Sequence, residues 1–104
     1  MAQEPSPALT EKIIGLGIKV HRALGAGLLE SVYNQCLCWE LQHNGLADIV
    51  VENSVLLEIK AVDHILPVHE AQTRTYLKLS SCRLALLLNF NTPMLKDGIR
   101  RFIN

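Results

Sequence analysis

Hydrophobic positions in the first quarter of the chain recur every three to four residues, which is the spacing of an amphipathic helix. We expect this helix over residues 10–24, because Thr10 is a favoured N-cap residue and Gly25 follows the last apolar position. Gly15 and Gly17 lower its helix propensity. Two glycines inside a helix usually mark the close approach of another element, and a loop-like start is the alternative interpretation.

Residues 28–43 keep the same spacing and predict a second helix, which Asn44 and Gly45 end. The two helices form an αα-hairpin. The pattern then changes to two short runs rich in β-branched residues, at 46–51 and 55–61, separated by three polar residues. These runs predict an antiparallel β-hairpin.

The second half of the chain predicts one more helix and two more strands. Pro67 suits the first position of a helix that continues over residues 68–80. Four of its residues share a three-to-four spacing: His69, Gln72, Tyr76 and Leu79. Residues 82–90 form an apolar run that predicts a central strand covered on both faces, and after Pro93 residues 98–103 predict a short edge strand. The pattern predicts an α/β fold with a small central mixed sheet flanked by helices.

The composition indicates one small domain. The chain has 104 residues, 49% of them hydrophobic and 19% charged, and its ten basic residues balance ten acidic ones. This excludes disorder and a multi-domain enzyme, and we expect a flexible segment at 1–9 before a single domain at 10–104. The zero net charge argues against the basic field typical of non-specific nucleic-acid binding, so a DNA contact would be local or metal-assisted. The mean hydropathy of +0.20 predicts apolar surface buried between subunits.

Several features of the sequence predict a cytoplasmic location. The first residues lack the basic and apolar regions of a secretory signal. No apolar run approaches the ~20 residues needed to span a bilayer, so we expect no membrane contact. The odd number of cysteines, at 36, 38 and 82, is typical of a reducing compartment rather than of a disulfide framework.

Two carboxylates of the predicted β-hairpin require an explanation. If residues 52–54 form the turn, Asp48 lies directly opposite Glu58, and Lys60 follows on the same face. The other face is entirely apolar and is expected to be core. Like charges opposed across two strands are destabilising, and Mg²⁺ or Mn²⁺ with oxygen ligands would reconcile them. The alternative is a surface charge cluster in which Lys60 neutralises both acids.

These residues and their surroundings carry a resemblance to a known family. Asp48 followed by Glu58-Ile59-Lys60 resembles the Asp…Glu-x-Lys signature of the PD-(D/E)xK nuclease superfamily, and residues 27–33 resemble the Gly-x-x-Glu-x-x-Tyr element of its GxxExxY family. Four further segments are similar to the same family: His21-Arg22, residues 67–72, residues 88–91 and residues 95–104. The resemblance covers residues 12–104 and implies a trimmed restriction-endonuclease-like core.

The resemblance also implies roles for individual residues. Asp48 and Glu58 resemble the metal-binding acids, Glu30 the helix glutamate that supplements the metal site, and Lys60 the catalytic lysine. The implied activity is hydrolysis of DNA phosphodiester bonds with Mg²⁺ or Mn²⁺, in which Asp48, Glu58 and Lys60 are the catalytic residues.

Two residues of the third helix resemble a substrate-binding motif. Gln72 and Tyr76, one turn apart, are similar to the Gln-x-x-x-Tyr motif of the exonuclease-like branch and are implied to contact DNA or the active site. The structural alternatives are that Tyr33 and Tyr76 are core aromatic residues and that Glu30 simply favours its helix N-terminus through the helix dipole.

One departure from the family concerns the segment before Asp48. Family members carry a longer stretch with an additional strand pair, whereas here residues 45–47 lead almost directly into Asp48. The chain is therefore expected to be internally shortened, with an exposed sheet edge that a homo-oligomer would cover. This supports a second hypothesis, a non-catalytic homo-oligomeric assembly protein that retains the nuclease scaffold.

Other candidate sites are weaker. His64 and His69 flank a loop and would join Glu70 around a transition metal, but their spacing matches no specific site. Lys96 with residues 100–101 forms a small basic patch, which is more often a solvated edge than a nucleic-acid surface. No glycine-rich phosphate loop, nucleophile elbow or dinucleotide fingerprint is present, so we expect no organic cofactor.

Overall fold

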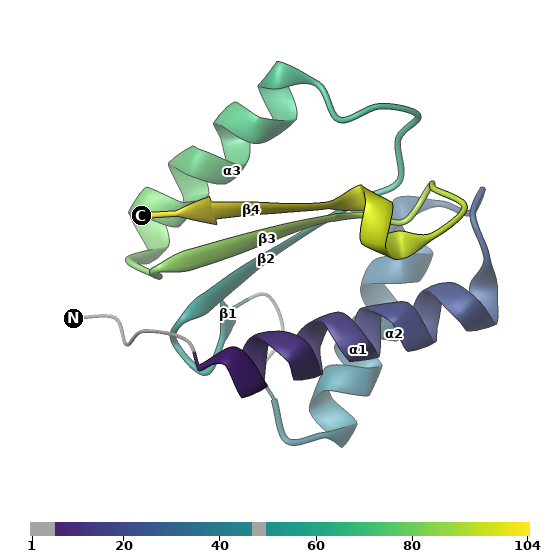
Figure 1. Ribbon diagram of the computed structural model, residues 1–104, viewed down its shortest axis with the longest axis horizontal. Coiled ribbons are helices and arrows are strands. Elements are labelled where there is room, and N and C mark those ends of the chain that lie inside the picture. The colour runs from purple at the N-terminus through teal and green to yellow at the C-terminus, as the bar shows by residue number, and fades with distance from the viewer. Residues whose placement is uncertain (1–5, 47–49) are drawn as a thin grey trace.

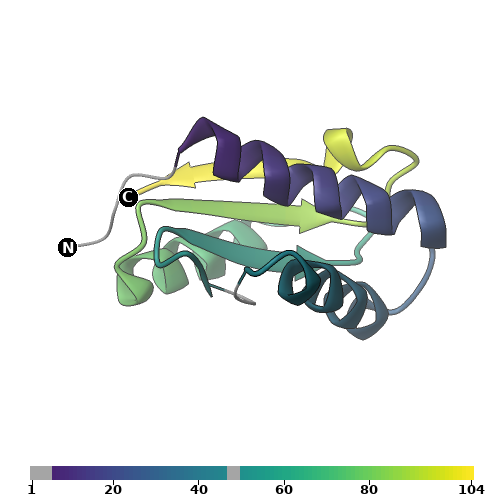
Figure 2. The same ribbon diagram turned by 90° about the horizontal axis from the view of Figure 1, so that it is seen from below.

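A computed structural model describes residues 6–46 and 50–104. A four-stranded sheet lies between two helical layers, with α1 and α2 on one face and α3 on the other (Figures 1 and 2). The elements, in chain order, are α1 (Pro7–Leu24), α2 (Glu30–His43), β1 (Val50–Val51), β2 (Val55–Lys60), α3 (Pro67–Ser80), β3 (Leu84–Asn89), the 3-10 helix η1 (Leu95–Gly98) and β4 (Ile99–Ile103). The predicted α/β fold with a small mixed sheet is confirmed.

The sheet has the strand order β1-β2-β3-β4. The β1–β2 hairpin is antiparallel, and Val51 pairs with Val55 as the expected three-residue turn requires. Strand β3 is parallel to β2 and antiparallel to β4, so the sheet is mixed. All six residues of β3 are buried, which confirms the prediction of a central strand covered on both faces.

Helix α1 begins three residues before the predicted position. Ser6 is the N-cap, since its Oγ accepts a hydrogen bond from the Leu9 N–H at 3.0 Å, and Pro7 occupies the first turn. Thr10, the expected N-cap, is instead buried within the helix. A serine followed by proline is a stronger start signal than a threonine alone, and this explains the correction.

The two glycines of α1 differ in their surroundings. A Cβ atom on Gly17 would lie 3.1 Å from the Leu95 side chain, so the expected close approach is confirmed there. At Gly15 nothing lies within 4 Å of such an atom, and the same explanation is wrong for that residue. Gly17 therefore allows η1 to pack against α1.

Helix α2 begins later than predicted and ends where predicted. It begins at Glu30, because Leu29 has an extended backbone and acts as the N-cap. Its end follows the predicted glycine stop, with Gly45 at a φ of 73°. Leu46, expected in the first strand, instead donates its N–H to the Leu41 carbonyl at 2.8 Å and so completes the helix end. The rest of that expected strand includes residues 47–49, which lie outside the described part of the chain.

Each face of the sheet has its own hydrophobic cluster. The larger cluster joins α1 and α2 to residues of β2 and β3, and the smaller one joins α3 to β2, β3 and β4. The three cysteines form no disulfide. Within residues 6–46 and 50–104, no helix has the length and apolarity needed to cross a membrane.

Candidate functional site

The candidate site lies at the carboxyl end of β2, where that strand leaves the core. Residues alternate between the two faces, so Leu56, Glu58 and Lys60 share the face toward α3. Leu56 is buried beneath α3, whereas Glu58 and Lys60 are partly exposed. The opposite face is core, as expected, and α3 also covers the beginning of this face at Leu56. Only its end is left open for chemistry.

The Lys60 amine interacts with the carboxyl groups of Glu30 and Glu58. Its Nζ is 4.0 Å from Oε1 of Glu30, and its side chain is 19% exposed against 51% for Glu30. Burial raises the pKa of the Glu58 carboxyl above its ordinary value, the Lys60 charge lowers it, and the Glu30 charge raises it. Glu30, Glu58 and Lys60 therefore interact electrostatically although they come from two elements.

Tyr33 fixes the loop that presents Glu30. Its side chain is fully buried, its hydroxyl donates to the Gly25 carbonyl at 2.6 Å and accepts from the Leu28 N–H at 3.1 Å. Its ring stacks on Phe90 with centroids 4.7 Å apart. The core interpretation is thus confirmed for Tyr33. Glu30 lies one helical turn earlier, in the first turn of α2, so the packing of Tyr33 determines where this carboxylate emerges.

Asn89 is a positioning residue that the sequence analysis missed. It pairs with Lys60 in the sheet and is 3% exposed. Its side-chain oxygen accepts from the Val62 N–H at 3.1 Å and the Asn91 N–H at 3.2 Å, and its amide nitrogen donates to the Val62 carbonyl at 2.9 Å. These bonds hold the chain directly after Lys60. The sequence did offer one signal for this role, because Asn89 is a polar residue near the end of the apolar run at 82–90.

Asp48, the other predicted metal-binding acid, lies outside the described residues. The register of Val50 with Leu56 matches the predicted one over the part of β1 that is described. Within residues 6–46 and 50–104, no group of three or more His, Cys, Asp or Glu side chains is arranged to hold a metal ion. Glu30 and Glu58 alone are therefore an incomplete ligand set.

Gln72 and Tyr76 lie on the flank of α3 that faces β2. Arg74 stacks on Phe102 of β4 at 4.7 Å, which marks the opposite flank, and Thr73 is buried at the sheet. Successive helix residues are about 100° apart, so Gln72 and Tyr76 lie on the other side of Thr73 from Arg74. Tyr76 is 44% exposed, and the alternative of a core aromatic residue is wrong for it.

The histidine candidate has a structural explanation. His69 accepts a hydrogen bond from the Leu66 N–H at 3.0 Å through Nδ1, and so caps the start of α3. His64 is exposed, and within the described chain it forms no metal-ligating group with His69 and Glu70.

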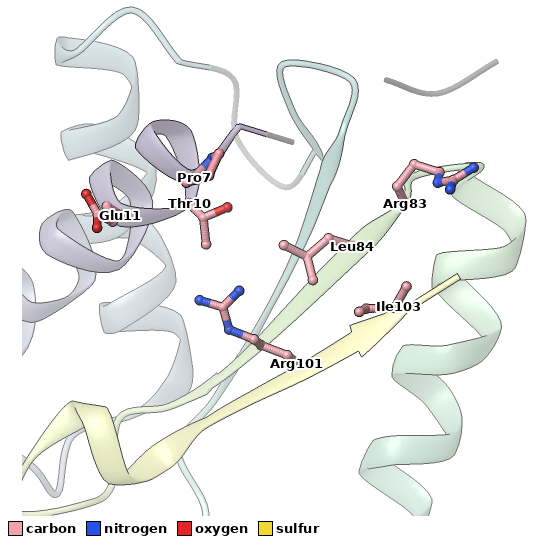
Figure 3. A pocket seen from close by; sticks show the side chains of 7 residues that line it. All are labelled: Pro7, Thr10, Glu11, Arg83, Leu84, Arg101 and Ile103. Atoms are coloured by element: carbon pink, nitrogen blue, oxygen red, sulfur yellow. The ribbon is translucent and has the colours of Figure 1, made fainter. Parts of the chain in front are cut away.

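A cavity of about 350 Å³ lies away from the candidate site, at the other end of β3 (Figure 3). Its lining includes Thr10, Leu84 and Arg101. Figure 3 shows the Arg101 side chain extending toward Thr10, whereas Arg83 points away. Neither Glu58 nor Lys60 lines this cavity.

Comparison with known protein families decides the relationship of this chain. Its sequence matches the PD-(D/E)XK nuclease superfamily over residues 7–47 and 46–102. The chain belongs to the PD-(D/E)XK nuclease superfamily. No curated protein and no solved structure matches it significantly. The mixed sheet with Glu58 and Lys60 on one strand is consistent with a trimmed PD-(D/E)XK core, and nucleases of this superfamily generally use divalent metal ions.

Proposed function

We propose that this protein is a divalent-metal-dependent nuclease that hydrolyses DNA phosphodiester bonds. The arrangement at the end of β2 carries the proposal: Glu58 and Lys60 share one face, and the Glu30 carboxylate is 4.0 Å from the Lys60 amine. Membership in the PD-(D/E)XK nuclease superfamily supports the nuclease chemistry.

Mg²⁺ or Mn²⁺ would be held by Glu58 and Asp48, with Glu30 as a supplementary ligand. The donors suit such an ion, because carboxylate oxygens are the preferred ligands of hard cations. Glu58 is partly desolvated and lies close enough to Glu30 for that charge to raise its pKa, so a cation beside them would stabilise both ionised groups. When bound, the ion would lower the pKa of a coordinated water and neutralise charge on the phosphate.

Lys60 would act on the reacting groups directly. Its amine interacts with Glu58 and Glu30, and its side chain is partly exposed, so the amine can donate hydrogen bonds to a water or a phosphate oxygen. In hydrolysis the water oxygen bonds to phosphorus as one P–O ester bond breaks. Lys60 would orient the water and stabilise the negative charge that develops on the phosphate. Gln72 and Tyr76, on the flank of α3 above β2, would contact the DNA.

The first experiment is a calorimetric titration of Mn²⁺ into the purified protein. We expect saturable binding that is lost in Asp48→Asn and in Glu58→Gln. The matched control is Glu52→Gln, which removes a carboxylate from the exposed turn of the same hairpin and should leave binding unchanged. Equal binding by the parent, Asp48→Asn and Glu58→Gln would refute this metal site.

The second experiment measures cleavage of single-stranded, double-stranded and flap DNA with Mn²⁺. We expect cleavage of at least one substrate, abolished by Lys60→Ala and retained in Lys78→Ala, which removes an exposed amine from α3. An absence of cleavage across the panel, or equal cleavage by Lys60→Ala, would rule out the proposed nuclease mechanism.

A homo-oligomeric assembly function is the second candidate. Leu29 and Trp39 are large apolar side chains that are 74% and 55% exposed, and an interface between subunits would remove them from water. The family match is made in two stretches that meet at residues 46–47, which supports internal shortening at the expected place. Light scattering tests the candidate, because a monomer at micromolar concentration would refute it.

A further inference from the structure

A groove between the end of α1 and the segment before η1 combines cationic and apolar groups. It has a volume of about 290 Å³. Arg22 and Lys96 supply its charge, and Ile18, Pro93 and Met94 supply apolar surface. No carboxylate lines it. The net charge of the chain is zero, so the groove is a local concentration of positive charge.

The two cations of the groove are available to a ligand. Arg22 and Lys96 are both exposed, and neither forms an ion pair with a described residue. Met94 beside them is 53% exposed. Cations without a carboxylate partner are free to pair with an anionic ligand. Phosphate is such a ligand, because it accepts charge-assisted hydrogen bonds from both arginine and lysine.

The walls of the groove are held in place by His21. Its Nε2 is 2.7 Å from the Thr92 carbonyl oxygen, which can only accept, so Nε2 carries the proton and donates it. His21 is 7% exposed, and this hydrogen bond joins α1 to the segment that carries Met94 and Lys96. The groove is therefore formed before any ligand binds.

The buried residue Phe90 lies between the groove and the candidate site and contacts a residue of each. The ring of Phe90 lies 6.1 Å from that of His21 and 4.7 Å from that of Tyr33, measured between centroids. Its backbone N–H donates to the Lys60 carbonyl at 2.9 Å. Figures 1 and 2 agree that the ends of α1, β2 and β3 gather at one end of the molecule. The groove therefore lies at the same end of the molecule as Glu58 and Lys60, and a DNA strand that passes around this end of the sheet would meet both.

We propose that this groove binds a nucleotide of the DNA strand on which the Glu58 site acts, with its phosphate on Arg22 and Lys96 and its base against Met94 and Pro93. The proposal rests on the proposed nuclease function. A phosphate alone would use only the cations, whereas an unstacked base also uses the apolar floor. Bases inside a duplex cannot reach such a floor, so the substrate class is DNA with a single-stranded segment.

The test measures binding separately from cleavage. A short fluorescein-labelled single strand is titrated with protein in EDTA, and anisotropy is recorded over a series of salt concentrations. In Arg22→Gln/Lys96→Gln we expect affinity to fall about tenfold and the salt slope to become shallower by about 0.7, the value for one lost phosphate contact on a single strand. Unlabelled single strand should compete better than duplex with the parent.

The matched control is Lys12→Gln/Arg101→Gln, which also removes one lysine and one arginine charge, but at positions away from the groove. Both residues are exposed, and Arg101 lines the cavity of Figure 3. We expect this variant to bind like the parent. Parent-like affinity in Arg22→Gln/Lys96→Gln, or an equal loss of affinity in both double variants, would refute the proposal that the groove binds DNA.

The cleavage assay separates the two proposals. If Arg22→Gln/Lys96→Gln weakens DNA binding but the parent protein cleaves no DNA, the groove would remain a DNA-binding site and the nuclease proposal would be refuted. If cleavage depends on Lys60 but DNA binding does not change in Arg22→Gln/Lys96→Gln, the nuclease proposal would stand and the groove proposal would be refuted. Duplex that competes as well as single strand would overturn the assigned substrate class.

Discussion

Replacing Asn89 with leucine should destabilise the protein more than any surface change near the site. The side chain is 3% exposed and makes three hydrogen bonds, two to Val62 and one to Asn91. Leucine has a similar size but no polar atoms, so all three bonds are lost while the space stays filled. The partners are partly exposed and water can reach them, so we take about 1 kcal/mol for each bond.

The loss of about 3 kcal/mol converts to a change in melting temperature. Unfolding entropy is about 2.1 cal/mol/K per residue, so for 104 residues the midpoint should fall by about 14 °C. Differential scanning calorimetry measures this directly. The control is Asn34→Leu on the exposed side of α2, where the Cys38 thiol donates a long hydrogen bond of 3.7 Å to the amide oxygen, and the midpoint should change little.

Amide hydrogen exchange locates the effect. Asn89→Leu should lose protection at the Val62 and Asn91 amides, because these N–H groups bond to the Asn89 oxygen. A fall of less than about 4 °C in the midpoint with both amides still protected would refute the reasoning, since less than about 1 kcal/mol would then be at stake.

Three further predictions use variants that need no ligand. In metal-free protein, Glu58→Gln should raise the melting temperature near pH 8 and leave it unchanged near pH 3. The pKa of Glu58 is raised in the folded state, so ionisation of this carboxyl destabilises the folded protein as the pH rises from about 4 through that pKa. Equal changes in melting temperature at both pH values would contradict this. Gly98→Ala should destabilise by more than about 2 kcal/mol in denaturant titrations, since its Cβ would clash with the backbone carbonyl oxygen of Asn89. Gly15→Ala, where nothing lies near the added Cβ, should instead stabilise by about 0.5–1 kcal/mol. Tyr33→Phe should cost about 1–2 kcal/mol in the same titrations because two hydrogen bonds are lost, and Tyr76→Phe, on an exposed side chain, should cost almost nothing.

The elements that sequence predicts best are those with one dominant signal. Helix α3 begins at Pro67, as proline at a first helical position indicates. Strand β3 is an apolar run too short for a buried helix and is buried throughout. The start of α1 was harder because Ser6 and Thr10 are both N-cap residues, and the adjacent Pro7 decides between them. Leu46 was misassigned because a leucine after glycine suits both a strand start and a helix end.

The candidate site was predictable only within one strand. The two-residue period of a strand places Glu58 and Lys60 on one face, and this needs no tertiary information. The approach of Glu30 to Lys60 joins two elements, and no local spacing determines it; only the family resemblance indicated it. Asn89 was missed because its hydrogen bonds go to the backbone of a distant loop, which the sequence pattern does not reveal.

The Gly-x-x-Glu-x-x-Tyr element explains how core packing and chemistry are connected here. Tyr33 is buried against Phe90, and Glu30 lies one turn earlier at the exposed start of the same helix. Phe90 also holds the Lys60 carbonyl and contacts His21. A substitution of the Phe90 side chain would therefore disturb Tyr33, which positions Glu30, and His21, which holds the groove, at the same time. Substitutions of the exposed charges at either place leave this core packing intact. The surface variants can consequently assign separate roles to the two sites, and a core variant cannot.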